Sequence, residues 1–298
     1  MKQQQSFGII DEIEKVNPLL RDRFLEPPFS VLDTKQDSWQ DRKRAWLALG
    51  IKSETGRNAG CMPKGFDEAK YGIKQSEETS IFDASLTELM YRWFCPDKGD
   101  ILDPFAGGSV RGIVANYLGY YYTGVELRQE QVDSNRTQAM DILPLNNQPN
   151  WYVGDTDKIL EQPWNKEFDF IFSCPPYGNL EVYSDLPDDL SNMDYSHFVS
   201  KLSSIIKKSV QLLKSDCYAC FVVSDFRDKQ GFYYDFTGDT KKAFSNAGCK
   251  LYNEAILLNC IGTAPIRAPH QFQASKKLVK VHQNVLIFKK VENDLSLL

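Results

Sequence analysis

Two short motifs in the middle of the sequence have residue types and spacing that could do chemistry. The first is LDPFAGGSVRG at 102–112, a glycine-rich turn between an apolar segment and a helical one. A turn without side chains lets a ligand approach the backbone closely at the start of a helix. The turn matches neither G-x-G-x-x-G nor G-x-x-x-x-G-K-[ST], so it indicates neither a dinucleotide fingerprint nor a nucleoside triphosphate cradle.

Acidic residues stand at the ends of three successive predicted strands: Asp103, Glu126 and Asp155. A carboxylate at Glu126 can accept hydrogen bonds from two ribose hydroxyls, as in other nucleoside-binding α/β folds. Asp155 can accept one from an adenine amino group. Each residue alone is more often a helix cap or a turn residue. Their common register favours a nucleoside site.

The second motif is FDFIFSCPPYGNL at 168–180. Two prolines in a row end the strand at Ser173 or Cys174, and they leave carbonyl acceptors without the matching backbone donors. Tyr177 offers a flat face on which a base can stack. The carbonyls can accept hydrogen bonds from an exocyclic amine of a base, while the Tyr177 ring holds that base. This arrangement suits chemistry at the amine. The alternative is a rigid turn packed by a tyrosine.

These motifs need an α/β sheet to position them, and apolar segments alternate with helical ones as such a sheet requires. The predicted strands are 100–104, 120–127, 151–155, 168–173, 217–225, 251–259 and 284–290. The predicted helices between them are 109–118, 129–140, 194–214 and 239–247. No helix separates the last two strands, so we predict a seven-stranded, mostly parallel sheet with a final antiparallel hairpin. An ordinary doubly wound sheet is the alternative, because one sequence does not give strand order.

Two segments outside this pattern carry basic residues. Residues 1–76 are polar and are predicted to form an accessory segment, with 77–298 as the main domain. A predicted helix at 38–51 carries Arg42, Lys43 and Arg44, which either contact nucleic acid or form a solvated face. The stretch 262–283 has no acidic residue and is predicted to be a hairpin loop. It either contacts phosphates or is a solvated loop, and its candidate phosphate contacts are Arg267, His270, Lys276, Lys277 and Lys280.

The composition is that of an ordinary globular protein of 298 residues, with 42% hydrophobic and 25% charged residues. A net charge of −5 excludes a uniformly basic coat but not a local basic face. The seven cysteines show no zinc spacing. Because there is also no secretory signal and no apolar run of membrane length, we expect a cytoplasmic protein with no structural metal and no membrane partner.

Together, the motifs resemble those of phage- and prophage-type DNA amino-methyltransferases, which modify adenine or cytosine. DPFAGG at 103–108 is similar to their DPF-x-G-x-G motif, and CPPY at 174–177 is similar to [DNS]-PP-[YF]. The segment 77–94 resembles the one that completes the methionine side of the cofactor pocket. VHQNVLIFKK at 281–290 resembles an H-[EQ]-x-x-L-x-F ending, and the segment from Pro27 to Ile51 resembles a phage methylase leader.

The resemblance implies a Rossmann-like fold that uses S-adenosyl-L-methionine (SAM) to methylate a base flipped out of double-stranded DNA. The expected cofactor-binding residues are Ser80, Phe82, Asp103, Pro104, Phe105, Ala106, Gly107, Gly108, Glu126 and Asp155. The expected catalytic residues are Ser173, Cys174, Pro175, Pro176 and Tyr177.

Cys174 departs from the family pattern, which has Asp, Asn or Ser there, and a thiol is a weak hydrogen-bond group. The amine would then rely more on the Pro175 carbonyl or on Ser173. Covalent attack by Cys174 would need an activated thiolate. The alternatives are an RNA base-amine methyltransferase, a catalytically weak nucleic-acid-binding protein and an enzyme that makes a larger base modification. The sequence leaves open the target base, the recognition sequence, a homodimer and a nuclease partner of a restriction-modification system.

Overall fold

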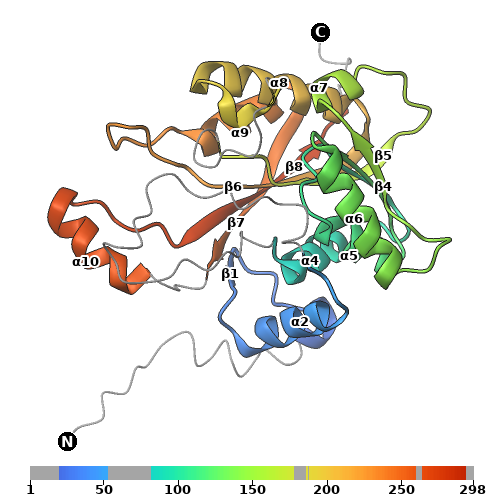
Figure 1. Ribbon diagram of the computed structural model, residues 1–298, viewed down its shortest axis with the longest axis horizontal. Coiled ribbons are helices and arrows are strands. Elements are labelled where there is room, and N and C mark those ends of the chain that lie inside the picture. Colours follow the sequence, from blue (N-terminus) through green and yellow to red (C-terminus); the bar gives the residue numbers. More distant parts are fainter. Residues whose placement is uncertain (1–19, 53–81, 178–185, 187, 260–263, 293–298) are drawn as a thin grey trace, which may run out of the picture.

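The computed structural model describes residues 20–52, 82–177, 186, 188–259 and 264–292. Its centre is one eight-stranded sheet of order β1-β7-β8-β6-β5-β2-β3-β4 (Figure 1). The strands are β1 (Val31–Asp33), β2 (Asp100–Asp103), β3 (Tyr121–Glu126), β4 (Asn150–Val153), β5 (Phe168–Ser173), β6 (Leu213–Val223), β7 (Cys249–Leu258) and β8 (His282–Lys290). Strand β8 is antiparallel to β6 and β7, and every other pairing is parallel. The predicted α/β fold, mostly parallel with a final antiparallel hairpin, is confirmed.

The strand count differs from the predicted seven because β1 joins the sheet. Val31–Asp33 pairs in parallel with residues 256–258 of β7, and Thr34 Oγ donates to the Leu258 carbonyl at 2.7 Å. Three residues are too few to show the alternation that identifies a strand in a sequence. The division of the chain at residue 76 stays a prediction, but part of the N-terminal segment belongs to the sheet.

Helices cover both faces of this sheet. They are α2 (Asp37–Ala48), α4 (Ala84–Phe94), α5 (Val110–Tyr117), α6 (Gln129–Ile142), α7 (Thr156–Ile159), α8 (Tyr195–Gln211), α9 (Phe236–Asn246) and α10 (Ala264–Ser275). Figure 1 shows α8 and α9 above the sheet and α4 and α5 below it. None of the described helices is long and apolar enough to cross a bilayer.

Each face of the sheet buries its own hydrophobic cluster. Phe170 and Phe172 of β5 belong to the cluster with α2, α4 and α5, whereas Phe168 and Ile171 belong to the one with α8 and α9. A register irregularity between Phe168 and Phe170 interrupts the alternation of the two faces. A strand covered on both faces has a continuous apolar sequence, which is why FDFIFS reads as an uninterrupted hydrophobic run.

The prediction of a hairpin loop over 262–283 is wrong in its first half, because helix α10 lies there. The prolines at 265 and 269 hid the helix from sequence analysis. Pro265 stands in the first turn, where its missing N–H has no helical partner, whereas Pro269 is inside the helix. Helix α10 extends away from the sheet (Figure 1), and its Ile266 and Phe272 are 57% and 46% exposed.

Candidate functional site

A cavity of about 630 Å³ opens at the carboxyl ends of the parallel strands. Residues that follow five of these strands line it: Thr34, Phe105, Leu127, Asp155 and Cys174. Open α/β sheets bind ligands at this edge, because the loops after neighbouring parallel strands converge there. Both sequence motifs therefore meet in one hollow.

The glycine turn after β2 is held by a buried network around Asp103. Asp103 Oδ2 accepts hydrogen bonds from Arg111 Nε at 2.6 Å and Tyr122 Oη at 2.7 Å, and Oδ1 accepts one from Ser173 Oγ at 2.6 Å. Arg111 Nη2 donates to two carbonyls of the turn at 2.6 and 3.0 Å. Burial alone would lower the pKa of Arg111, but the adjacent Asp103 raises it, so the guanidinium stays charged. Asp103 and Ser173 hold the turn and do not line the cavity.

Gly107 is the residue of this turn that needs to be glycine. Its φ is +52°, a left-handed conformation that side-chain-bearing residues rarely adopt. A Cβ there would meet no atom within 4 Å, so the backbone faces open space. Its N–H donates to Glu126 Oε2 at 3.1 Å, and its carbonyl accepts from Asn135 Nδ2 at 2.8 Å.

Glu126 links this turn to the end of β3. Its two oxygens accept backbone hydrogen bonds from Gly107 and Arg128, each at 3.1 Å, and Arg128 Nε lies 3.4 Å from Oε1. Burial raises the pKa of Glu126, while Arg128 opposes that rise. A carboxylate oxygen has room for more than one donor, so both oxygens keep capacity for a ligand in the cavity.

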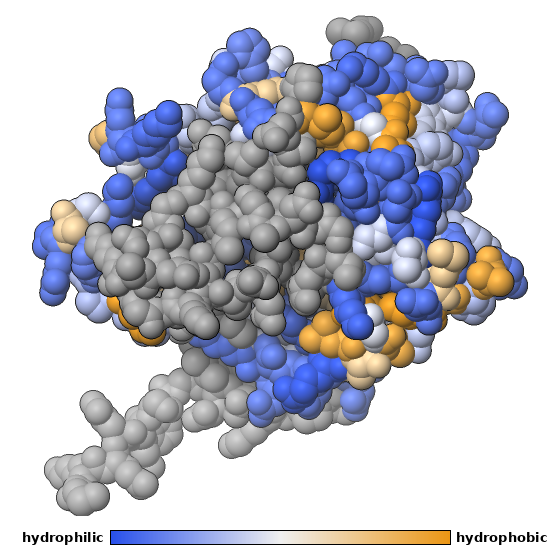
Figure 2. Space-filling model, viewed as in Figure 1, coloured by the Kyte–Doolittle hydropathy of each residue, from blue (hydrophilic) through white to orange (hydrophobic). Residues whose placement is uncertain are grey.

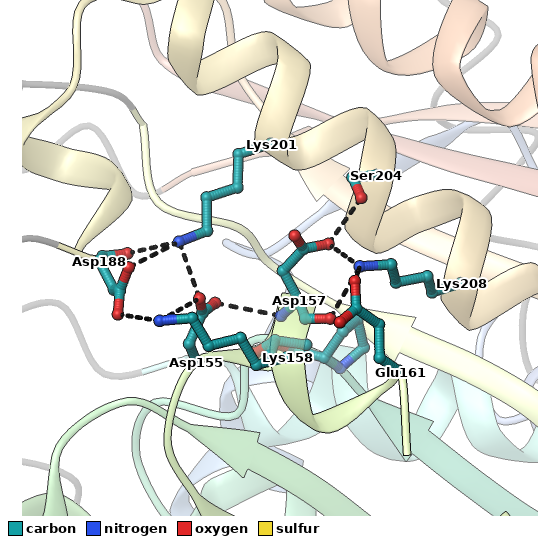
Figure 3. A network of polar contacts seen from close by, with 10 residues as sticks. Asp155, Asp157, Lys158, Glu161, Asp188, Lys201, Ser204 and Lys208 are labelled. Carbon is teal, nitrogen blue, oxygen red and sulfur yellow. Dashed lines mark hydrogen bonds and ion pairs between the residues drawn. The ribbon is translucent and has the colours of Figure 1, made fainter. Parts of the chain in front are cut away.

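Asp155 does two things. Its Oδ1 caps α7 by accepting from the Asp157 N–H at 3.1 Å, as expected for a carboxylate that acts as a helix cap. Its Oδ2 accepts from Lys201 Nζ at 3.1 Å and lies 3.7 Å from Lys158 Nζ (Figure 3). The carboxylate also lines the cavity, so a ligand would meet an acceptor fixed in place by a helix terminus and a lysine.

The CPPY segment forms the wall after β5. Cys174, Pro175, Pro176 and Tyr177 all line the cavity. Tyr177 Oη accepts from Gln283 Nε2 at 2.6 Å and lies 3.6 Å from Cys174 Sγ. Sequence analysis did not select Gln283, although it stands in the H-[EQ]-x-x-L-x-F pattern that was the available signal.

The remaining predicted residues divide as follows. Among the cofactor candidates, Phe82, Pro104, Phe105, Gly107 and Gly108 line the cavity together with Glu126 and Asp155. Asp103, Ala106 and Ser173 are buried away from it. Ser80 lies outside the described residues. The cavity also has polar lining residues that were not among the predicted cofactor-binding or catalytic residues, among them Gln40, Lys43, Asp83, Asp188, Asp225 and His282.

The five predicted phosphate contacts are spread over and beyond α10. His270 and Lys276 are exposed, Lys277 is half-buried, and Arg267 lies on α10 with its side chain outside the description. Lys280 lines the cavity, with its Nζ 3.7 Å from Asp225 Oδ2. Burial lowers the pKa of Lys280, and Asp225 opposes the shift. Among the described residues, no cluster of three or more His, Cys, Asp or Glu is arranged to hold a metal.

No protein-family model matches this sequence, and no curated protein matches it. Some solved structures are similar to this chain at low sequence identity. A candidate RNA methyltransferase from Pyrococcus horikoshii is 16% identical, with a TM-score of 0.49 over 85% of this chain and 98% of the other. TrmN from Thermus thermophilus is 13% identical, with a TM-score of 0.49 over 88% of this chain and 81% of its own. A candidate DNA modification methylase, also from Thermus thermophilus, is 16% identical, with a TM-score of 0.34 over 47% of this chain and 51% of the other.

Proposed function

We propose that this chain is a SAM-dependent methyltransferase that acts on the exocyclic amine of adenine or cytosine in DNA. One observation carries the proposal: a single cavity joins the Gly107 turn and Glu126 to the Pro175–Pro176–Tyr177 segment. The first pair suits a nucleoside cofactor, and the second suits a flat base with an amino group. Because both parts line the same cavity, two molecules bound there would lie close enough for a group to pass from one to the other.

The residues around the turn fit SAM. Glu126 is half-buried, anchored by two backbone N–H groups and able to accept hydrogen bonds from both ribose hydroxyls. The open space beside Gly107 lets the ligand lie against the backbone. Asp155 offers an acceptor for an adenine amino group at the end of β4. When bound, SAM supplies a methyl group made electrophilic by its sulfonium sulfur.

The wall after β5 would hold the acceptor base. Pro175 and Pro176 have no N–H, so their backbone presents only carbonyl acceptors to an amine. A flipped base stacked on Tyr177 places its amine beside them. The Pro175 and Pro176 carbonyls would orient the amine toward the methyl group that SAM would supply, and the amine nitrogen would release one proton to solvent. Cys174 forms no covalent bond in this mechanism.

DNA as the substrate is supported by the motif resemblance and by basic residues near α10, including His270, Lys276 and Lys277. The net charge of −5 confines any phosphate contact to a local face. Figure 2 shows hydrophilic residues over much of the coloured part of the surface, with hydrophobic groups between them.

The test is incubation of the protein with methyl-tritiated SAM and, in separate reactions, duplex DNA, single-stranded DNA or structured RNA. We expect label in duplex DNA and, after digestion, N6-methyladenine or N4-methylcytosine by mass spectrometry. Label in RNA alone would show that the substrate is RNA and not DNA. DNA retention without any label would contradict the enzyme proposal and support a binding protein.

A further inference from the structure

A pair of opposite charges lines the cavity where α2 approaches the start of α4. Lys43 lies on α2 and Asp83 directly precedes α4, with 3.9 Å between Lys43 Nζ and Asp83 Oδ2. The two side chains are 35% and 16% exposed, and both face the cavity. We refer to Lys43 and Asp83 as the charge pair.

The carboxylate of this pair is fixed in place by three donors. Asp83 Oδ1 caps α4 by accepting from the N–H groups of Ser85 and Leu86 at 2.8 and 3.1 Å. Asp83 Oδ2 accepts from Trp39 Nε1 at 3.1 Å. Trp39 is 2% exposed and lies one helical turn before Lys43, on the same face of α2. The burial of Trp39 therefore directs Lys43 toward the cavity.

Lys43 differs from the basic residues on either side of it. Arg42 Nη1 lies 3.3 Å from Glu88 Oε2, and Arg42 Nη2 donates to the Leu25 carbonyl at 3.3 Å. Arg44 is 66% exposed and pairs with Asp41 on its own helix. Of the three, Lys43 alone lines the cavity. The basic run that suggested nucleic acid or a solvated face thus contains one residue that faces the cavity.

The charge pair stands on the opposite side of β2 from the nucleoside residues. Glu126 is the last residue of β3 and Asp155 follows β4, and both strands lie on one side of β2 in the sheet. Phe82, adjacent to Asp83, packs edge-on against Phe172 of β5, which lies on the other side. A ligand with its ribose at Glu126 and its middle against the Gly107 turn therefore extends toward the charge pair.

We propose that the charge pair binds the α-amino acid end of SAM, with Lys43 donating to its carboxylate and Asp83 accepting from its ammonium group. The inference rests on the proposed function and deepens it. An α-amino acid carries its two opposite charges on groups attached to the same carbon, and a lysine and a carboxylate 3.9 Å apart form the complement. Helix α2, in the N-terminal segment, thereby becomes part of the cofactor site.

The experiment is calorimetric titration of the full chain with two probes, S-adenosylhomocysteine and 5′-methylthioadenosine. Both contain the adenosine thioether, and the second lacks the amino acid. We expect the wild type to bind S-adenosylhomocysteine more tightly. Lys43→Ala should weaken that binding about tenfold, as expected for loss of a charge-assisted hydrogen bond, and leave 5′-methylthioadenosine binding unchanged.

Arg44→Ala is the matched control on the same helix and should change neither affinity. Asp83→Asn is the second variant, because asparagine still caps a helix while losing the charge; it should also weaken S-adenosylhomocysteine alone. Wild-type binding to both probes with no selective loss in Lys43→Ala overturns the charge-pair proposal and leaves the proposed function standing. A wild type that binds neither probe overturns the proposed function itself.

Discussion

Tyr177 has both its ring and its hydroxyl group constrained. Gln283 Nε2 donates to its Oη at 2.6 Å, and Phe236 packs edge-on against its ring with centroids 6.2 Å apart. An aromatic ring fixed before the ligand arrives loses little conformational entropy on stacking. In the proposed acceptor site, Gln283 of β8 and Phe236 of α9 together set the orientation of Tyr177.

Replacing Tyr177 tests this role. Tyr177→Ala should lower kcat/KM for methyl transfer to the nucleic acid by roughly tenfold to a hundredfold, the cost of losing one base-stacking contact. The affinity for S-adenosylhomocysteine should stay unchanged. Tyr177→Phe keeps the ring and loses only the contacts of the hydroxyl group, so its kcat/KM should fall less. Transfer by Tyr177→Ala at the wild-type rate would exclude stacking on this ring.

Sequence analysis selected residues of the site that lie in motifs and missed those that reach it through tertiary packing. Glu126 stands at the end of one predicted strand and Tyr177 follows another, so the convergence of parallel strands brings them to one edge. Lys43 comes from a helix whose position depends on the burial of Trp39, and no local pattern reveals that. Ser173 was selected correctly as a strand end, but its side chain points to Asp103, a direction that the sequence does not specify.

At the scale of elements, α7 depends on α8. Four residues are too few for a helix that is stable alone. Lys208 of α8 donates to Asp157 Oδ1 at 2.7 Å and to Glu161 Oε1 at 2.6 Å, and Ser204 donates to Asp157 Oδ1 at 2.6 Å (Figure 3). These contacts hold the turn that begins at Asp155, and so they support the cavity wall.

The free energy of unfolding should depend on pH through the contacts of Asp157 with α8. Burial alone would raise the pKa of Asp157, but hydrogen bonds from Lys208 and Ser204 outweigh it and lower the pKa below 3.8. A carboxylate whose pKa is lower in the folded state stabilises the fold above its unfolded pKa and loses that contribution as the pH falls. Asp157→Asn should therefore reduce the free energy of unfolding by about 1 kcal/mol at pH 7 and by less at pH 3.

Urea unfolding of both proteins at the two pH values measures the difference. Asp97→Asn, a change in an exposed carboxylate before β2, is the control. An equal difference between wild type and Asp157→Asn at both pH values would contradict the role of the ionised Asp157.

Most long elements were predicted within a few residues, whereas helix α4, the three-residue strand β1 and the proline-containing helix α10 were not. Helix α8, predicted over 194–214, spans Tyr195–Gln211, because its buried residues recur with helical spacing over several turns. Strand β1 is determined by its pairing with β7, and α10 tolerates a proline that normally ends a helix. Neither property is local, so neither appears in the sequence pattern.

At the scale of the whole molecule, an acidic protein must concentrate its contacts with phosphates. Helix α10 projects from the body (Figure 1), and the half-buried Lys277 follows the exposed Lys276 just beyond its end. Over the whole chain, acidic residues outnumber basic ones, 40 to 35. If this region binds DNA, binding should weaken with salt by an amount set by a few cations rather than by the total charge.

The salt dependence of DNA binding tests this expectation. Lys276→Ala and Lys277→Ala should each reduce the slope of log Kobs against log salt concentration by roughly 0.9, the value for one phosphate contact. Lys207→Ala removes an exposed lysine on α8 and should leave the slope unchanged. Fluorescence anisotropy with a labelled duplex measures the slopes. Equal slopes for all four proteins would remove the α10 region from the interface.

The pairing of β1 with β7 has a consequence for biosynthesis. Thr34 donates a hydrogen bond to Leu258, 224 positions later in the chain. Strand β1 is therefore synthesised long before the strand with which it pairs. Closing so long a loop is slow, and folding rates fall as contacts become less local. We expect β1 to pair only after β7 has left the exit tunnel, so that a nascent chain stalled before residue 249 lacks the pairing that places Thr34 at the cavity.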